Sequence, residues 1–275
     1  MVTLSGFADE ISSDLDVQLN ILQSEGIRYI EFRGIWNKNV LDLTDNELTK
    51  MKKVLHQKGF RISSIGSPIG KISIIDNFEE HVKRFERAIY VAKFFDTKYI
   101  RIFSFYIPGG KDPEFYRDEV MRRLSKLVKK AEEEGIVLLH ENEKDTYGDN
   151  AERCLDIMKT IHSSHLQSAF DPANFVQCGV KPYSEAYPLL QPYIEYVHIK
   201  DALFIDGKEV PAGQGDGEVQ EVLGALINRG YNGYLSLEPH LAASGTFSGF
   251  SGPELFKVSA QALKDLLTEL QYAWK

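Results

Sequence analysis

Residues 120–142 read VMRRLSKLVKKAEEEGIVLLHEN and contain one complete helix-and-strand unit of this chain. The first half of this stretch carries apolar residues at helical spacing, namely Val120, Leu124, Leu127 and Ala131. This spacing predicts a helix with one apolar face. Gly135 follows, as is common where a helix ends on a residue with positive φ. The run 136–141 is short and rich in Ile, Val and Leu, which is typical of a buried parallel strand.

The same unit recurs along the whole chain. Short apolar runs alternate with segments of helical period, and no linker or low-complexity stretch interrupts the series. The eight runs cover residues 2–8, 27–32, 60–66, 99–105, 136–141, 166–171, 196–201 and 234–238. Eight such units predict an α/β fold with a single domain, residues 1–275, in the form of a closed (β/α)₈ barrel. An open doubly wound sheet is the alternative, but its glycine-rich first turn is absent from residues 7–11.

The composition is that of an ordinary globular protein, with 43% hydrophobic and 26% charged residues. The formal net charge is −8 and the longest basic runs are pairs, which argues against a nucleic-acid-binding surface. Cys154 and Cys178 form no disulfide framework and are typical of a reducing compartment. No run approaches the roughly 18 apolar residues of a membrane span, and the N-terminus lacks the basic region of a signal peptide. We therefore expect a cytoplasmic protein that binds neither membrane nor nucleic acid.

The last four predicted strands end on metal-binding side chains, which in chain order are Glu141, Asp171, His198 and Glu238. The carboxyl ends of barrel strands converge on one face, where the active sites of this architecture lie. Three carboxylates on one rim would repel one another unless a cation lay among them. A lone Glu or His at a strand end is more often a structural partner, so the predicted metal site depends on all four positions together.

The donor set also indicates which ion such a site would hold. Three oxygen donors and one nitrogen donor suit Mn²⁺, Mg²⁺ or Co²⁺ better than a sulfur-rich structural zinc site does. Zn²⁺ stays open as an alternative, because His and carboxylates also hold zinc in catalytic sites. We expect one divalent ion, with Mn²⁺ ahead of the others, and no organic cofactor.

Several longer stretches of the chain occur in the order and spacing of one enzyme family. They are GFADEIS (6–12), GIVLLHEN (135–142), AFDPANF (169–175), YVHIKDA (196–202), PAGQGDGEV (211–219) and GYLSLEPH (233–240). On these stretches the chain resembles the sugar phosphate isomerases and epimerases with a xylose-isomerase-like TIM barrel. Relatives in that group include ketose 3-epimerases, hydroxypyruvate isomerase, inosose dehydratase and, more distantly, enzymes of the endonuclease IV type. The resemblance implies the same four metal ligands as the strand ends.

The resemblance weakens in the part of the site that would contact substrate. Ketose epimerases of the family carry a histidine three residues after the metal-binding aspartate, where this chain has Asn174. They carry an arginine six residues after the metal-binding histidine, where this chain has Phe204. The substrate is therefore expected to differ from that of the well-known ketohexose epimerases.

The resemblance and the predicted geometry together imply an isomerase or epimerase acting on a sugar, a sugar phosphate or a related polyhydroxy carbonyl compound. A metal-bound carbonyl acidifies the neighbouring C–H bond and stabilises the enediolate that forms. Glu141 and Glu238 come from non-adjacent strands, so they can flank the substrate as the catalytic acid and base. Asp171 and His198 would serve mainly as metal ligands.

Three other classes of function stay open at this stage. A dehydratase or lyase acting on a cyclitol or keto-sugar would use the same enolisation and then expel a β-hydroxyl, with Lys200 or His240 as an added acid. A non-catalytic sugar-binding barrel would retain the ligands without turnover. A phosphodiesterase of the endonuclease IV type would need further His and Asp or Glu ligands and a basic groove, and is disfavoured.

Six further residues are candidates for substrate binding: Lys200, Asn174, Glu31, Arg33, Lys71 and His240. Lys200 lies two residues after His198, so in a regular strand both side chains point to the same side. Glu31 and Arg33 end the second strand and could contact sugar hydroxyls or pair with each other. Lys71 could hold a phosphate or carboxylate, although a solvated loop lysine is the simpler interpretation. His240 could support a metal ligand, as could Glu143.

Two local motifs follow the seventh strand. The segment 203–210 predicts a small hairpin with a type I′ turn at Asp206-Gly207. Gly213, Gly215 and Gly217 leave backbone N–H groups free ahead of a helix, as phosphate sites of barrels do, although spaced glycines are a weak motif. The expected partner is a small sugar or sugar phosphate, and a homodimer is a further expectation because barrels of this type often pair.

Overall fold

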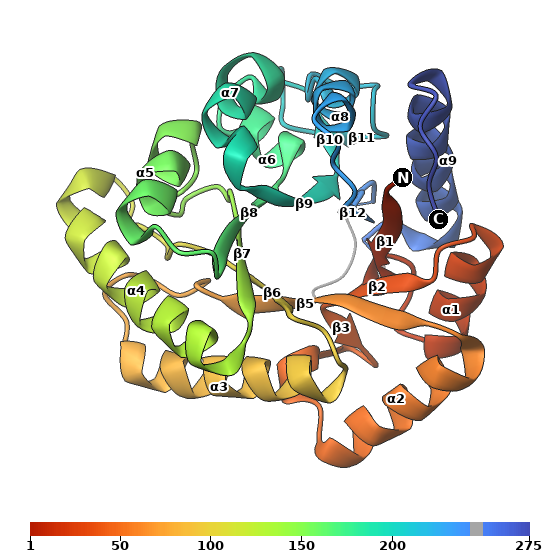
Figure 1. The fold of residues 1–275 in the computed structure, drawn as a ribbon, viewed down its shortest axis with the longest axis horizontal. Helices are drawn as coiled ribbons and strands as arrows, with labels where there is room; N and C mark the ends of the chain where they lie inside the picture. Colours follow the sequence, from red (N-terminus) through yellow and green to blue (C-terminus); the bar gives the residue numbers. More distant parts are fainter. Residues whose placement is uncertain (243–249) are drawn as a thin grey trace.

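The computed structural model describes residues 1–242 and 250–275, and its main strands close into a parallel barrel (Figure 1). In order around the barrel the strands are β1 (Thr3–Phe7), β12 (Tyr234–Leu237), β9 (Ile194–Ile199), β8 (Leu166–Phe170), β7 (Val137–Glu141), β6 (Tyr99–Ile102), β5 (Arg61–Ile69) and β2 (Tyr29–Phe32). Every neighbouring pair is parallel. Each of the eight predicted runs overlaps one barrel strand, so the predicted fold is confirmed.

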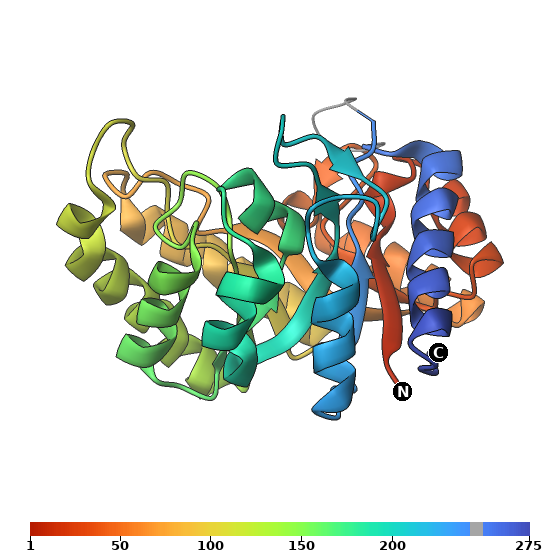
Figure 2. The same cartoon turned by 90° about the horizontal axis from the view of Figure 1, so that it is seen from above.

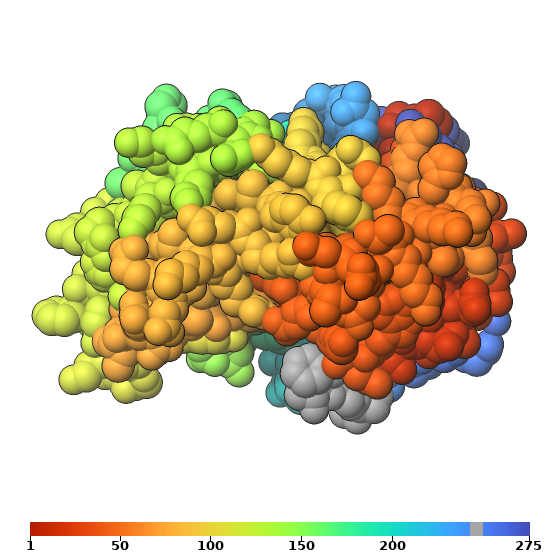
Figure 3. All heavy atoms as spheres, turned by 90° about the horizontal axis from the view of Figure 1, so that it is seen from below, coloured from red at the N-terminus to blue at the C-terminus, as the bar shows by residue number. Residues whose placement is uncertain are grey.

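Helices surround the ring of strands (Figure 1). They are α1 (Leu15–Ser24), α2 (Asp45–Lys58), α3 (Phe78–Phe94), α4 (Arg117–Glu134), α5 (Ala151–Ile161), α6 (Pro172–Gln177), α7 (Tyr187–Leu190), α8 (Val219–Asn228) and α9 (Gly252–Glu269). Short helical turns lie at η1 (Ala8–Glu10), η2 (Val40–Asp42), η3 (Pro113–Tyr116), η4 (Pro182–Ala186) and η5 (Gln191–Tyr193). Figure 3 shows the α2, α3 and α4 segments as adjacent orange to yellow-green bands on one side. None of the described helices has the length and apolar character needed to cross a membrane.

Local sequence signals define where these helices begin and end. The α2 helix starts with a capping box, in which the Thr44 side chain accepts from the Glu47 amide and the Glu47 carboxylate accepts from the Thr44 amide. Gly135 ends α4 in the left-handed conformation, with φ of 70°. A side chain at that position would be strained, which explains why glycine separates the helix from β7.

The side chains that fill the barrel become more polar toward the carboxyl-terminal end of the strands. Near the amino-terminal end, Tyr99, Leu139, Ala169 and Tyr196 pack together. Hydroxyl groups come next, where Ser63 Oγ lies 2.7 Å from Ser5 Oγ and 2.9 Å from the Tyr196 hydroxyl. His198 follows two residues further along β9, so the ionisable ligands lie at the carboxyl-terminal end of the barrel.

Two small antiparallel pairs lie outside the barrel sheet. The predicted hairpin after β9 exists, but β10 (Asp201–Ala202) pairs with β11 (Glu209–Val210) across a six-residue connection, so the predicted two-residue type I′ turn is wrong. A type I′ turn needs positive φ at both central residues, and of Asp206 and Gly207 only the glycine has it, at 71°. The pair β3 (Gly34–Ile35) and β4 (Lys38–Asn39) was not predicted. Figure 2 shows β10 and β11 at one end of the barrel.

The loop after β5 is held by a buried histidine of α3. The Gly70 amide donates to His81 Nε2 at 2.7 Å, and the His81 side chain is buried. Gly70 itself has φ of 91°, and an added Cβ would lie 2.0 Å from the Phe103 carbonyl oxygen, so the loop has little freedom here. Burial and the nearby Arg84 and Arg123 guanidinium groups lower the pKa of His81 to about 4.

This histidine predicts a specific loss of stability in acid. In the unfolded chain His81 should take up a proton near its ordinary pKa of about 6.5, whereas the folded protein does so only near pH 4. The contribution of His81 to the free energy of unfolding is therefore fully present above pH 6.5, and it falls by roughly 3 kcal/mol as the pH is lowered to 4. His81→Gln keeps an acceptor for the Gly70 amide but cannot titrate, so its unfolding free energy should depend less on pH in this window.

Urea unfolding of wild type and His81→Gln at several pH values between 7 and 4 tests this prediction. Other titrating groups are common to both proteins and cancel in the comparison. His56→Gln, which removes an exposed histidine of α2, is the matched control and should track wild type. If the free energy of unfolding varies with pH in the same way in wild type and in His81→Gln, His81 is not the cause of the loss of stability in acid.

Candidate metal centre

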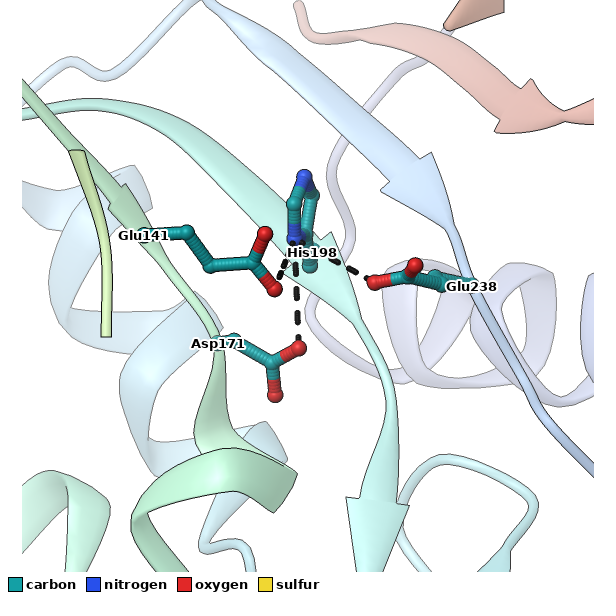
Figure 4. Close-up of side chains that lie close together, drawn as sticks. All are labelled: Glu141, Asp171, His198 and Glu238. Atoms are coloured by element: carbon teal, nitrogen blue, oxygen red, sulfur yellow. Dashed lines mark ion pairs between the residues drawn. The ribbon is translucent and has the colours of Figure 1, made fainter. Parts of the chain in front are cut away.

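Four neighbouring strands deliver the predicted ligands to one point. Glu141 is the last residue of β7, Asp171 follows β8 directly, His198 lies near the end of β9, and Glu238 follows β12 directly. All four side chains point toward one another (Figure 4), and each residue is at most 2% exposed. Parallel strands that end at the same level of a barrel explain this convergence.

The imidazole of His198 lies at the centre of the cluster. Its Nδ1 atom is 3.2 Å from Glu141 Oε1, 3.5 Å from Glu238 Oε2 and 3.8 Å from Asp171 Oδ2. One ligand atom from each of the four residues lies within 4.8 Å of the others. The four ligand atoms thus lie close enough together to share one cation.

Unsatisfied atoms provide the test of whether the cluster fits a metal. Within residues 1–242 and 250–275, four buried atoms of the cluster have no hydrogen-bond partner: His198 Nδ1, Glu141 Oε2, Asp171 Oδ2 and Glu238 Oε2. A buried polar atom without a partner is costly, and carboxylate oxygens cannot satisfy one another. A divalent cation among them satisfies oxygen and nitrogen donors together, so these residues fit the predicted ion.

Electrostatics support the same conclusion. Burial lowers the pKa of His198, but attraction to the Glu141 and Glu31 carboxylates outweighs burial and raises it well above 6.5. Burial is also the largest influence on Asp171, whose pKa rises to about 7 despite the opposing charge of Lys200. Asp171 thus tends to retain a proton near neutral pH in the absence of another cation, and a divalent ion would displace that proton.

The other imidazole nitrogen faces Glu31. His198 Nε2 lies 3.2 Å from Glu31 Oε2 and 3.4 Å from Glu31 Oε1, and the Glu31 side chain is fully buried. A carboxylate in this position takes the Nε2–H and leaves Nδ1 free as a ligand. The structure therefore places Glu31 behind His198, whereas the sequence had suggested contact with substrate or with Arg33.

Asn174 connects two of the candidate ligands, Glu141 and Asp171, to Lys200. The Asp171 Oδ1 atom accepts from the Asn174 amide at 2.9 Å and caps α6, which leaves Asp171 Oδ2 for a metal. The Asn174 side chain donates to Glu141 Oε1 at 3.1 Å and accepts from Lys200 Nζ at 2.9 Å. Lys200 Nζ is also 3.6 Å from Asp171 Oδ2. As predicted, Lys200 points to the same side of the chain as His198.

Two arginines lie beside the glutamates that flank the cluster. Arg33 donates to Glu238 Oε1 at 2.6 Å and also pairs with Asp9 and Glu10 instead of Glu31. Arg101 is buried, and its Nη1 lies 3.1 Å from Glu141 Oε2 and 3.5 Å from Glu238 Oε1.

The sequence prediction missed three of these charged residues: Arg101, Asp9 and Glu10. The signal that could have found Arg101 is a charged residue inside an otherwise apolar strand, Tyr99–Ile102. Such a residue in a barrel needs a buried partner of opposite charge. Asp9 and Glu10 lie in η1, just after β1, and are acidic yet buried, but their common partner Arg33 follows β2, which the linear sequence does not reveal.

A cavity of about 390 Å³ opens above the cluster. Its lining includes the six residues Arg33, Lys71, Arg101, Glu141, Lys200 and Glu238. Lys71 pairs with Glu143 at 2.7 Å, at the rim of the cavity. His240 Nε2 lies 2.9 Å from Glu10 Oε1 and 3.7 Å from Glu238 Oε1. The volume suits a small polar molecule.

The glycine-rich loop is not an open phosphate site. Asp201 is fully buried, and its carboxylate accepts from the amides of Gly213, Gly215 and Gly217 at 2.8 to 3.0 Å. An added Cβ at Gly215 or Gly217 would lie within 2.5 Å of Asp201 Oδ1. The glycines thus allow the backbone to enclose an internal carboxylate, which occupies the amides that were expected to bind phosphate.

Comparison with known proteins gives consistent results. Residues 19–266 match the family model described as a xylose isomerase-like TIM barrel. A 3-dehydroshikimate dehydratase from Bacillus anthracis is 22% identical over 199 residues, which are 71% of this chain and 69% of that protein. A D-tagatose 3-epimerase-like protein has a TM-score of 0.78 at 20% identity over 98% of both chains. The IolI protein, whose crystal structure holds a zinc atom, has a TM-score of 0.74 at 18% identity over 99% of both chains.

Proposed function

The chain belongs to the family of xylose isomerase-like TIM barrels, and from this premise we propose that it is a divalent-metal-dependent isomerase or epimerase. Its substrate would be a sugar, a sugar phosphate or a related polyhydroxy carbonyl compound. Similarity to a D-tagatose 3-epimerase-like protein and to a 3-dehydroshikimate dehydratase supports chemistry of this kind. The observation that carries the proposal is the convergence of the four buried ligand residues beneath a cavity that both glutamates line.

The ion is proposed to be Mn²⁺, bound by Glu141, Asp171, His198 and Glu238. Three carboxylates and one imidazole favour a hard or borderline ion over one that prefers sulfur. Mg²⁺, Co²⁺ and Zn²⁺ are the competitors, and a relative with the same fold holds zinc. The identity of the ion is therefore a quantity to measure in protein purified without chelator.

The residues around the ion account for the proposed proton transfer. An ion bound here would polarise a substrate carbonyl and stabilise the negative charge that develops on its oxygen. Glu141 and Glu238 come from β7 and β12, on different sides of the cluster, and can face the two sides of a bound substrate. One carboxylate would remove the proton beside the carbonyl and the other would return a proton. Lys200 has N–H groups directed at Asn174 and the cavity, where it can orient a substrate oxygen.

A dehydratase is the second candidate, and Lys200 is the observation that favours it. Its ammonium group is buried beside Asp171 and lines the cavity, which is a suitable position for an acid that protonates a leaving hydroxyl. A relative that matches over 71% of this chain is a 3-dehydroshikimate dehydratase. Proton removal beside the carbonyl is common to both reactions, so they differ only in whether water is then lost.

Exchange of substrate hydrogen with solvent tests the proposal and separates its alternatives. Metal-loaded protein would be incubated in D₂O with ketoses, their phosphates and cyclitol ketones, and followed by NMR. Deuterium incorporated beside the carbonyl with no loss of water supports the isomerase or epimerase. Loss of water identifies the dehydratase. If compounds bind but none shows exchange, the result would favour a non-catalytic sugar-binding protein over an enzyme. Protein stripped of metal is the control and should show no exchange.

A further inference from the structure

Arg33 makes an unusually complete set of contacts beside the metal ligands. Its Nε donates to Asp9 Oδ2 at 2.7 Å, its Nη2 to Glu10 Oε1 at 2.7 Å, and its Nη1 to Glu238 Oε1 at 2.6 Å. The guanidinium also lies over the ring of Phe7 at 4.5 Å and the ring of Phe250 at 4.8 Å. Three carboxylates and two aromatic faces hold this cation in one position.

The position of this guanidinium coincides with a second group of metal-binding side chains. Ligand atoms of Glu10, Glu238 and His240 lie within 4.8 Å of one another. Arg33 contacts all three, since its Nη1 is also 3.4 Å from His240 Nε2. The donors of a second cation site are therefore present, and the guanidinium of Arg33 contacts each of them.

Glu238 belongs to both groups and divides its two oxygens between them. Its Oε1 accepts from Arg33, whereas its Oε2 has no hydrogen-bond partner in residues 1–242 and 250–275 and faces His198 Nδ1. If a metal ion were bound at Oε2, Glu238 would connect that ion to the guanidinium of Arg33. This arrangement would resemble the shared carboxylate of a two-metal centre, with the guanidinium in place of one ion.

We propose that Arg33 is the fixed second cation of this site and keeps the centre mononuclear. It neutralises Asp9 and Glu10, holds one oxygen of Glu238, and so directs the other oxygen to the single metal ion. This inference rests on the proposed metal centre. Without the guanidinium, the Asp9, Glu10 and Glu238 carboxylates would face one another beside His240, and a second divalent ion would be attracted to them.

Titration with Co²⁺, followed by calorimetry and by visible absorption, tests the inference without any substrate. Wild type should bind one ion per chain. Arg33→Met, which keeps the length but removes the charge, should bind two. Arg33→Met combined with His240→Ala should return to one, because the second group then loses its nitrogen donor. Arg33→Lys keeps a positive charge and should also bind one ion.

Each alternative result has a definite meaning. Two ions in wild type would leave the metal centre intact and overturn the role of Arg33, as would one ion with unchanged affinity in Arg33→Met. If wild type binds no ion, the chain has no metal centre, and the proposed function is then wrong as well. If Arg33→Met does not fold, Arg33→Gln is the second neutral variant and should likewise bind two ions; one ion with unchanged affinity there would overturn the role of Arg33. Arg117→Met, which removes a paired arginine on α4, is the matched control and should bind one ion.

Discussion

Glu141→Gln is expected to lower the rate of substrate turnover by about 10²- to 10⁴-fold, the range that a positioned acid or base contributes. The amide has nearly the same shape and still offers an oxygen to the Asn174 side chain, which donates to Glu141 Oε1 at 3.1 Å. It cannot accept a proton from carbon. Burial raises the pKa of Glu141, but His198 and Arg101 outweigh burial and lower it to about 2, so the native side chain is ionised.

The measurement is the rate of solvent exchange or turnover, made together with the metal content of the same sample. A variant that retains its ion yet loses turnover separates proton transfer from metal binding. Glu134→Gln makes the same chemical change on the exposed end of α4 and should behave as wild type. A metal-loaded Glu141→Gln protein with more than about a tenth of the wild-type rate would exclude Glu141 as the base.

His198→Ala is expected to abolish measurable metal binding. His198 Nδ1 is the nitrogen donor of the set and lies within 3.8 Å of an oxygen of each carboxylate ligand. Partners behind a ligand typically change metal affinity by about 10- to 100-fold, so loss of the ligand itself should exceed about 100-fold. Glu31→Gln should fall within that smaller range, because it weakens only the carboxylate contact that holds Nε2.

Dissociation constants for Mn²⁺ or Co²⁺ measured by calorimetry provide the comparison. His56→Ala removes an exposed histidine of α2 and is the matched control for lost histidines. If His198→Ala binds the metal with wild-type affinity, His198 is not a metal ligand. A Glu31→Gln variant that binds metal more weakly than His198→Ala would show that Glu31, rather than the imidazole, is the ligand.

The local pattern of the sequence was sufficient for the fold. Each unit of apolar helix face, glycine and apolar strand run is a property of neighbouring residues, and eight such units bury their strands here in a closed barrel. The convergence of Glu141, Asp171, His198 and Glu238 was equally predictable. All four lie at or near strand ends, and parallel strands place those ends on one face whatever the details of side-chain packing.

The side chains that contact those four residues could not be predicted from the sequence pattern. Arg33 and Glu238 are 205 residues apart, and only closure of the barrel brings β2 close enough to β12 for contact across β1. Glu31 and Arg33 lie on the same strand end, yet one turns to His198 and the other to Asp9 and Glu10. Spacing along one strand does not reveal which distant charge each side chain meets.

The glycine loop illustrates the same division. Its glycines predicted free amides suited to a phosphate, whereas the amides converge on an internal carboxylate, an approach that residues without a Cβ allow. The sequence did not reveal that Asp201 supplies this anion from 12 to 16 residues earlier in the chain. Periodicity and turn chemistry act over a few residues and therefore determine elements and the fold. Charge pairing acts through space, so the tertiary structure alone decided which buried carboxylates meet arginine, backbone amides or a metal ion.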